Sequence, residues 1–313
     1  MFEPETTPLF CLTAESESPV QLARQHTIGQ AVRTRGIGFF TGCDVTMTLH
    51  PAPPGHGVTF TRTDRPGTPP IPATVDHLAP QPRRTALAGP DGRPAVQMIE
   101  HTMAAIAGLG LDNIRVELDG PECPGFDGSA EELTGRLLDA GLVEQDAPRP
   151  VLEVTHAVQV GRDDAWIRAE PSRSGGLEIE YRLDYPHPQV GRQHYQIELC
   201  PRVFQYQLAD ARTFILQQEV APLRAMGIGT RHTHRDLVVF GPDGPIDNPL
   251  RHSDEPVRHK LLDCVGDFAL AGCELRGRFT CHRSGHAMNQ QIIRELLTTH
   301  AVVRDSIPLT RAA

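Results

Sequence analysis

The chain has 313 residues, of which 39% are apolar and 22% are charged, and its formal net charge is −9 at pH 7. These fractions are those of ordinary globular proteins and exclude a disordered or low-complexity chain, and at about 150 residues per domain the length predicts two domains. Because the charge is negative and no long cluster of Lys or Arg occurs, we expect no nucleic-acid partner.

The sequence indicates a protein without an integral membrane segment. No stretch approaches the about 18 consecutive apolar residues of a membrane-spanning helix, and the N-terminus lacks the basic start of a secretory signal. The seven cysteines are scattered and form no C-x-x-C pair, a distribution typical of reduced thiols rather than of a disulfide framework. We therefore expect a cytoplasmic location.

The first half of the sequence is rich in predicted strands. Residues 1–24 mix Pro, Thr, Ser and Glu without periodicity and predict a flexible N-terminal extension. Short strands follow, among them 45–49 and 58–60, separated by turns that contain Gly and Pro. The apolar residues of 98–107 then fall on one face of a helix, and 113–118 alternates as a half-buried strand. This order predicts an α+β layer.

The segment 147–150, Ala-Pro-Arg-Pro, is the best candidate for a linker, because prolines stiffen the chain and disfavour a helix on either side. We therefore predict a first α+β domain at 25–147 and a second at 151–313. The second half shows strands at 151–160 and 177–183 and helical stretches at 216–226, 255–270 and 287–298. The predicted fold class is α+β, with two similar domains, each a sheet layer packed with helices.

The strongest chemical signal is the spacing of His259, Asp263 and Asp267, which are four residues apart and therefore share one face of a helix. An imidazole and a carboxylate one turn apart can bind the same cation, and a further carboxylate can orient a neighbouring group. The alternative is an exposed helical face on which His and Asp form hydrogen bonds. The spacing by itself leaves both interpretations open.

Two other segments contain candidate catalytic or metal-binding residues that could act together with this helix. Glu100 and His101, adjacent at the start of the predicted 98–107 helix, can supply a carboxylate base and a further imidazole ligand, although an isolated Glu-His pair has no specific meaning. Ser284-Gly285-His286 places His286 near the start of a helix. Its alternative is a helix cap with a solvated histidine.

A zinc site follows when these features are combined. His101, His259 and Asp263 supply three protein ligands and leave a fourth position for water, the composition of a catalytic rather than a structural zinc site. Zinc lowers the pKa of a bound water to about 7. Iron can occupy similar ligands, so the metal carried in the cell stays open between zinc and iron.

The remaining groups suit hydrolysis of an amide. Glu100 can take the proton of the water, and Thr213 can donate a hydrogen bond to the oxyanion that forms from the carbonyl. His286, kept protonated by Asp267, can stabilise charge or protonate the leaving amine. We therefore predict Glu100, Thr213, His286 and Asp267 as the catalytic set.

Six segments carry a resemblance to a known enzyme family: Ile99–Ala105, Asp112-Asn113 with Val116-Glu117-Leu118, Pro121–Ala130, Ala211–Phe214, Val257–Asp267 and Ser284–Asn289. In these segments, which occur in the family's order, the chain resembles the zinc-dependent UDP-3-O-acyl-N-acetylglucosamine deacetylases. The likeness extends from about Gln25 to Leu297. It implies removal of the N-acetyl group from an acylated UDP-N-acetylglucosamine, with release of acetate, in the committed step of lipid A synthesis.

The resemblance also implies roles for residues and a fold. It implies Zn²⁺ on the three ligands above, and substrate contacts for Phe214 and for Lys260, whose cation suits a phosphate; the alternative for Lys260 is a solvated helix lysine. The implied fold has two similar β-α-α-β domains with the active site at their interface, and a βαβ insert near 214–240 that forms a passage for the acyl chain. We expect a monomer.

The chain departs from the family pattern where substrate is expected to lie. Phe40 stands at a position where a histidine is typical, and Arg231-His232 stands where small residues are usual. Either these are neutral changes in loops, or the bulky residues narrow or redirect the acyl passage. Two alternative functions stay open for this reason, a paralogue with another acyl or sugar substrate and a non-catalytic member that binds a sugar nucleotide or lipid.

Overall fold

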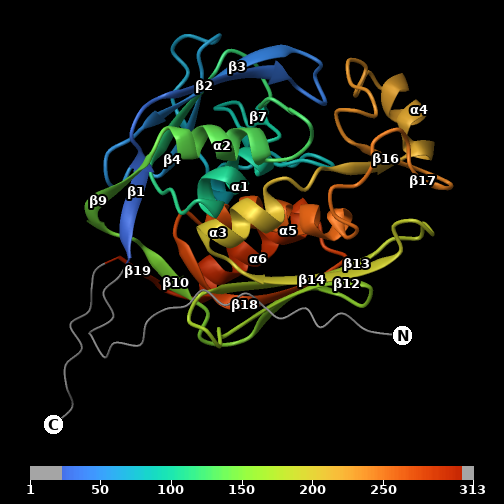
Figure 1. Ribbon diagram of the computed structural model, residues 1–313. Coiled ribbons are helices and arrows are strands. Elements are labelled where there is room, and N and C mark those ends of the chain that lie inside the picture. The colour runs from blue at the N-terminus through green and yellow to red at the C-terminus, as the bar shows by residue number, and fades with distance from the viewer. Residues whose placement is uncertain (1–22, 305–313) are drawn as a thin grey trace.

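The computed structural model describes residues 23–304, so the extension predicted at 1–24 lies outside the described residues except for its last two positions. Two β-sheets form the outer layers of the molecule, and helices fill the space between them (Figure 1). Across the molecule the layers are therefore sheet, helices, helices and sheet, and the α+β fold class is confirmed.

The sheet of the first half has five strands in the order β2-β3-β8-β4-β5. Their bounds are β2 Val32–Ile37, β3 Asp44–Pro51, β8 Ile114–Leu118, β4 Val58–Arg62 and β5 Ile71–Pro72. Two small ribbons flank it, β1 (Arg24–Ile28) with β9 (Leu142–Pro148) and β6 (Ala86–Ala88) with β7 (Pro94–Gln97). Alternation of buried and exposed residues in β3 and β8 follows the period of two expected when one face covers the core.

The sheet of the second half has seven strands, in which β18 pairs with β10, β12 and β13. The strand bounds are β10 Val151–Glu153, β11 Val158–Arg162, β12 Ala165–Glu170, β13 Leu177–Asp184, β14 Arg192–Glu198, β18 Glu274–His282 and β19 Val302–Val303. The single strand predicted at 151–160 is wrong, since β10 and β11 are separate strands with different partners. The chain crosses from the first half to the second between β9 and β10.

Helices from the two halves meet in the middle of the molecule. α1 (Glu100–Gly108) packs against α5 (Glu255–Phe268), with α2 (Glu131–Asp139) and α6 (His286–Thr299) beside them. A Cβ atom on Gly266 of α5 would lie only 2.0 Å from the carbonyl oxygen of Glu100. Glycine is therefore required where α5 approaches the start of α1.

The helix predicted at 98–107 forms as α1, and its burial extends beyond the face of Ile99, Met103 and Ile106. Eight of the nine residues of α1 are buried, including Glu100 and His101. The reason is the layering, because α1 has the first sheet on one side and α5 on the other and is left with no broad solvent face. Its polar side chains consequently lie inside the protein, where they need partners.

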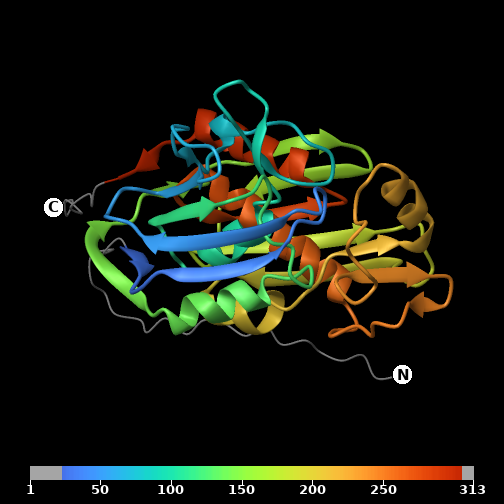
Figure 2. The same ribbon diagram turned by 90° about the horizontal axis from the view of Figure 1, so that it is seen from above.

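Residues 214–241 form a β-α-β unit that projects at one end of the molecule, the orange segment in Figures 1 and 2. β15 (Phe214–Leu216) and β16 (Val238–Gly241) pair in parallel on either side of α4 (Gln217–Ala225), and β17 (Gly244–Pro245) adds an antiparallel edge. The shorter elements are η1 (Val75–His77), α3 (Pro201–Val203), η2 (Phe204–Leu208) and η3 (Ala269–Ala271). No helix within 23–304 is long and apolar enough to cross a membrane.

Candidate active site

Three side chains from α1 and α5 face one another between the halves. The Nε2 atoms of His101 and His259 lie 3.6 and 3.4 Å from the same carboxylate oxygen, Oδ1 of Asp263. One ligand atom from each residue lies within 4.8 Å of the other two. The Oδ1 atom is buried and accepts no hydrogen bond from any described residue, which is costly for a carboxylate unless a cation joins it. The residues therefore fit a divalent metal ion with two nitrogen ligands and one oxygen ligand.

The protonation states of these ligands agree with metal binding. Burial lowers the pKa of His259 to about 4, so the imidazole is neutral at pH 7. Its Nδ1 lies 3.0 Å from the carbonyl oxygen of Ala211; because a carbonyl only accepts, Nδ1 carries the hydrogen and Nε2 is free to bind a metal. Burial opposes ionisation of Asp263, but the Lys260 ammonium outweighs it and holds the pKa of the carboxyl well below its usual range.

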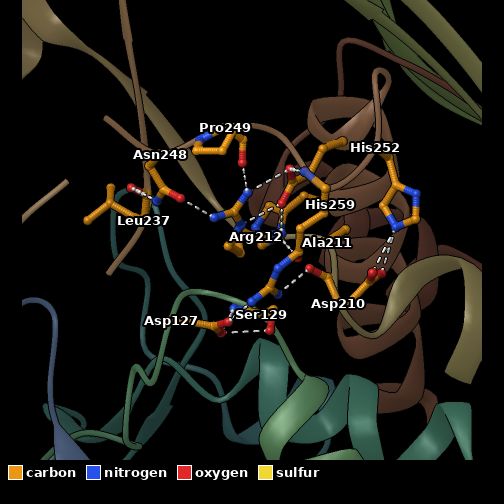
Figure 3. A network of polar contacts seen from close by, with 12 residues as sticks. Asp127, Ser129, Asp210, Ala211, Arg212, Leu237, Asn248, Pro249, His252 and His259 are labelled. Carbon is orange, nitrogen blue, oxygen red and sulfur yellow. Dashed lines mark hydrogen bonds and ion pairs between the residues drawn. The ribbon is translucent and has the colours of Figure 1, made fainter. Parts of the chain in front are cut away.

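A buried ion pair between Arg212 and Glu255 positions the carbonyl of Ala211. Ala211 and Arg212 are labelled in Figure 3. Arg212 and Glu255 are 5% and 0% exposed, and Nε of Arg212 donates to Oε1 of Glu255 at 2.7 Å. The backbone N–H of Arg212 donates to the same oxygen at 3.0 Å, and its guanidinium also reaches Asn248 and the carbonyl of Pro249. Since Ala211 directly precedes Arg212, the ion pair fixes the peptide that orients His259.

Arg212 and Glu255 were not predicted as functional. Arg212 belongs to a segment that carries the family resemblance, but the sequence assigned it no role, and Glu255 lies 43 residues further along the chain. No short spacing links the two. A related ion pair joins the halves beside them, since a guanidinium nitrogen of Arg251 lies 2.6 Å from Oδ2 of Asp127 and the Arg251 backbone N–H donates to Glu255.

The groups predicted to move protons lie next to the ligands. Nδ1 of His286 donates to Oδ2 of Asp267 at 2.8 Å, and its Nε2 lies 3.9 Å from Oε1 of Glu100. Burial raises the pKa of Glu100, although His286 and His101 oppose this. Burial disfavours the charged form of His286, but the Asp267 carboxylate outweighs it, with help from Asp263 and Glu100, and raises the pKa to about 10. Glu100, a buried candidate base, and His286, a protonated candidate acid, are thus adjacent.

These residues open on a cavity of about 1090 Å³. Its lining includes Glu100, His101, Thr213, Phe214, His259, Lys260, Asp263 and His286. Asp267 is fully buried behind His286 and does not line the cavity. The structure therefore brings together all nine predicted site residues, eight on the cavity wall and one behind it.

Two of the lining residues have partners of their own. Nζ of Lys260 donates to Oδ2 of Asp263 at 2.8 Å, so its cation balances the carboxylate as well as facing the cavity. The ring of Phe214 packs against Tyr185 and Phe240, with centroids 5.2 and 5.9 Å away. Phe214 is therefore a fixed apolar wall at the base of the β-α-β unit.

The two departures from the family pattern have different structural roles. Phe40 lines the cavity and carries the guanidinium of Arg84 over its ring at 4.0 Å. Arg231 points away from the cavity and donates to Oδ2 of Asp44 and to the carbonyl of Gly42, both at 2.8 Å. His232 lines the cavity and packs against Phe39 with the rings tilted by 39° and their centroids 4.3 Å apart. Arg231 therefore ties the β-α-β unit to the turn before β3 instead of filling the passage.

Comparison with known proteins places residues 25–298 in one family. The family model described as UDP-3-O-acyl N-acetylglycosamine deacetylase (LpxC) matches residues 25–298. A protein of Myxococcus xanthus named UDP-3-O-acyl-N-acetylglucosamine deacetylase is 37% identical over 282 residues, which cover 88% of this chain and 86% of that protein. Proteins of the same name from Actinobacillus pleuropneumoniae serotype 3 and Shewanella baltica (strain OS155) are 34% and 36% identical, over 88% and 87% of this chain and 90% and 89% of theirs.

Proposed function

The chain belongs to the UDP-3-O-acyl-N-acetylglucosamine deacetylase family, and we propose that His101, His259 and Asp263 hold the zinc ion with which it hydrolyses the N-acetyl group. The protein is a hydrolase of lipid A biosynthesis, and its products are acetate and the free amine of the acylated UDP-sugar. The observation that supports the zinc proposal is the buried Oδ1 of Asp263, which has two imidazole Nε2 atoms beside it and no hydrogen-bond donor among the described residues.

His101, His259 and Asp263 would hold the Zn²⁺ ion, which would supply polarisation of the acetyl carbonyl and a lowered pKa of a water molecule. Glu100 acts as the base, because burial raises the pKa of its carboxyl and Oε1 faces the cavity side near His286. The hydroxyl of Thr213 donates a hydrogen bond to the oxyanion of the tetrahedral intermediate. His286 is protonated at neutral pH and delivers its Nε2 proton to the amine as the intermediate collapses. Lys260 contacts the nucleotide-sugar phosphates, and Phe214 lines the path of the acyl chain.

Acetate release from a defined substrate tests this function and its two alternatives. We expect the zinc-loaded protein to release one acetate per molecule of UDP-3-O-acyl-N-acetylglucosamine. A paralogue would release acetate only from another N-acetyl sugar conjugate. A non-catalytic member would bind the sugar nucleotide without turnover, which the complete set of site residues opposes.

The dependence of kcat/KM on acyl-chain length tests whether Phe40 and His232 alter substrate preference. Because Arg231 is held outside the cavity by Asp44, we expect the passage to remain open to long chains. Each fully buried methylene contributes about 0.8 kcal/mol, so four more carbons correspond to about 200-fold if all are buried, and we expect kcat/KM to rise at least about tenfold. The measurement is kcat/KM on short- and long-acyl substrates, and an equal or lower value for the long chain would favour the narrowed passage.

The pH dependence of kcat/KM reports the protonated state of His286. Its raised pKa, about 10, keeps the imidazole protonated through neutral pH, so activity falls on the basic side as the proton is lost. Asp267→Asn removes the carboxylate that holds this proton, and we expect the basic limb to move to lower pH by roughly 1–3 units. A basic limb at the same pH in both proteins would exclude His286 as the group that titrates there.

We also propose a cytoplasmic location and a monomeric enzyme. All six cysteines within 23–304 are free, which supports a reducing compartment. Every proposed ligand and catalytic group comes from one chain, which supports a monomer as the catalytic unit. Size-exclusion chromatography of the zinc-loaded protein with light scattering tests the second proposal.

A further inference from the structure

Thr85 lies between Glu100 and Asp267, the carboxylate that holds His286. It is 1% exposed and directly precedes β6. Its backbone N–H donates to Oε2 of Glu100 at 3.0 Å, and its hydroxyl donates to Oδ1 of Asp267 at 2.6 Å. One residue from the first half thus contacts the carboxylate on α1 and the carboxylate on α5.

The direction of the hydroxyl proton is determined by its neighbours. A carboxylate oxygen only accepts, so the single hydroxyl proton of Thr85 must point to Asp267. The lone pairs of the same hydroxyl accept from Nε2 of Gln290 at 3.1 Å. At its other oxygen, Oδ2, Asp267 accepts from His286 Nδ1 at 2.8 Å and from Asn289 Nδ2 at 2.9 Å. Asp267 is therefore held at both oxygens and presents Oδ2 to His286 in one orientation.

The backbone of Thr85 restrains Glu100 in a similar way. Its carbonyl accepts from the N–H of Ile99, the residue before α1, at 3.2 Å, while its N–H occupies Oε2 of Glu100. The second oxygen, Oε1, is the one that lies 3.9 Å from His286 Nε2. Thr85 thus leaves one oxygen of Glu100 available on the side where the proton must move.

We propose that Thr85 is a positioning residue, whose hydroxyl aligns His286 through Asp267 while its backbone aligns Glu100. The base and the acid are thereby held at a fixed distance and direction from each other. This inference rests on the roles proposed above for Glu100 and His286. Thr85 does not itself contact the reacting atoms. Its effect is on the distance and direction of proton transfer, to which rates are sensitive at the scale of 1 Å.

Thr85→Val tests the hydroxyl, because valine keeps the shape and both backbone contacts while Asp267 Oδ1 and Gln290 Nε2 lose their partner. We expect kcat to fall about 10- to 100-fold with KM changed less than about threefold. The zinc content stays at the wild-type value, and Thr85→Ser, which restores the hydroxyl, recovers most of kcat. If the valine variant does not fold, Thr85→Ala removes the same hydroxyl without adding a methyl group.

A double-mutant cycle with His286→Ala separates positioning from structural support. If Thr85 acts through Asp267 and His286, the valine substitution has little further effect on kcat once His286 is absent. An equal fold-loss of kcat in both backgrounds overturns the proposal, as does a failure of serine to restore activity.

Thr27→Val is the matched control. The Thr27 hydroxyl is also buried, donating to the carbonyl of Asn113 at 2.6 Å and accepting from the N–H of Ala52, but it lies outside the cavity lining. We expect this variant to unfold at a lower temperature and to keep kcat. If the wild-type protein releases acetate and Thr85→Val has the same kcat, only the role of Thr85 is refuted. If the wild-type protein releases no acetate, the proposed function itself is refuted.

Discussion

We expect Glu100→Gln to lower kcat by about 10²- to 10⁴-fold while the protein keeps one zinc ion per chain. The amide has the size of the carboxylate and still accepts the backbone N–H of Thr85, but it cannot take a proton from water. Burial, which raises the pKa of Glu100, makes the carboxylate a stronger base than an exposed glutamate. Because the groups of His101, His259 and Asp263 are unchanged, metal binding is expected to persist.

The measurement combines steady-state acetate release with the zinc content of the same sample. Glu180→Gln is the matched control, since Glu180 is also a buried carboxylate, 6% exposed, but pairs with Arg182 and Arg278 and does not line the cavity. It should keep wild-type kcat. Wild-type turnover in the Glu100 variant would remove Glu100 from the role of base.

His101→Ala removes one of three proposed ligands and is expected to abolish stoichiometric zinc binding, and with it nearly all acetate release. Two ligands remain on α5, and His101 is the only one that α1 contributes. Zinc that binds the native state raises its stability in proportion to the logarithm of zinc concentration over the dissociation constant. The unfolding temperature of the wild-type protein should therefore fall with a chelator, and that of the variant should hardly respond.

His50→Ala provides the control for loss of a histidine, because His50 is half-buried and paired with Glu117 at 3.2 Å on the first sheet. It should retain one zinc ion and the same response to the chelator. Unchanged zinc stoichiometry in His101→Ala would take His101 out of the ligand set, and the buried Oδ1 of Asp263 would then need another partner.

Local spacing in the sequence predicted much of the site. His259, Asp263 and Asp267 share a helical face at intervals of four, and the sequence placed Glu100 and His286 near helix starts, where α1 and α6 indeed begin. These signals are short-range, because a helix repeats every 3.6 residues whatever it packs against. The family resemblance added what spacing does not contain, the substrate and the reaction.

Contacts between distant segments could not be predicted from the sequence. Thr85 lies 182 residues from Asp267, and Glu255 lies 43 residues from Arg212, and neither pair has a spacing that a periodic pattern can mark. The direction of Arg231 was also undecided, since a long side chain can line a passage or leave it. The ion pair with Asp44, the first residue of β3, holds the Arg231 side chain outside the cavity.

The sequence by itself therefore determined the fold class, the helical face that carries two of the three proposed ligands, and the family. Only the tertiary structure decided how α1 and α5 meet at Gly266, which side chains are buried together, and which oxygen of each carboxylate is left free. The physical reason is that secondary structure follows local periodicity, whereas the positions of proton donors and metal ligands depend on packing between elements far apart in the chain.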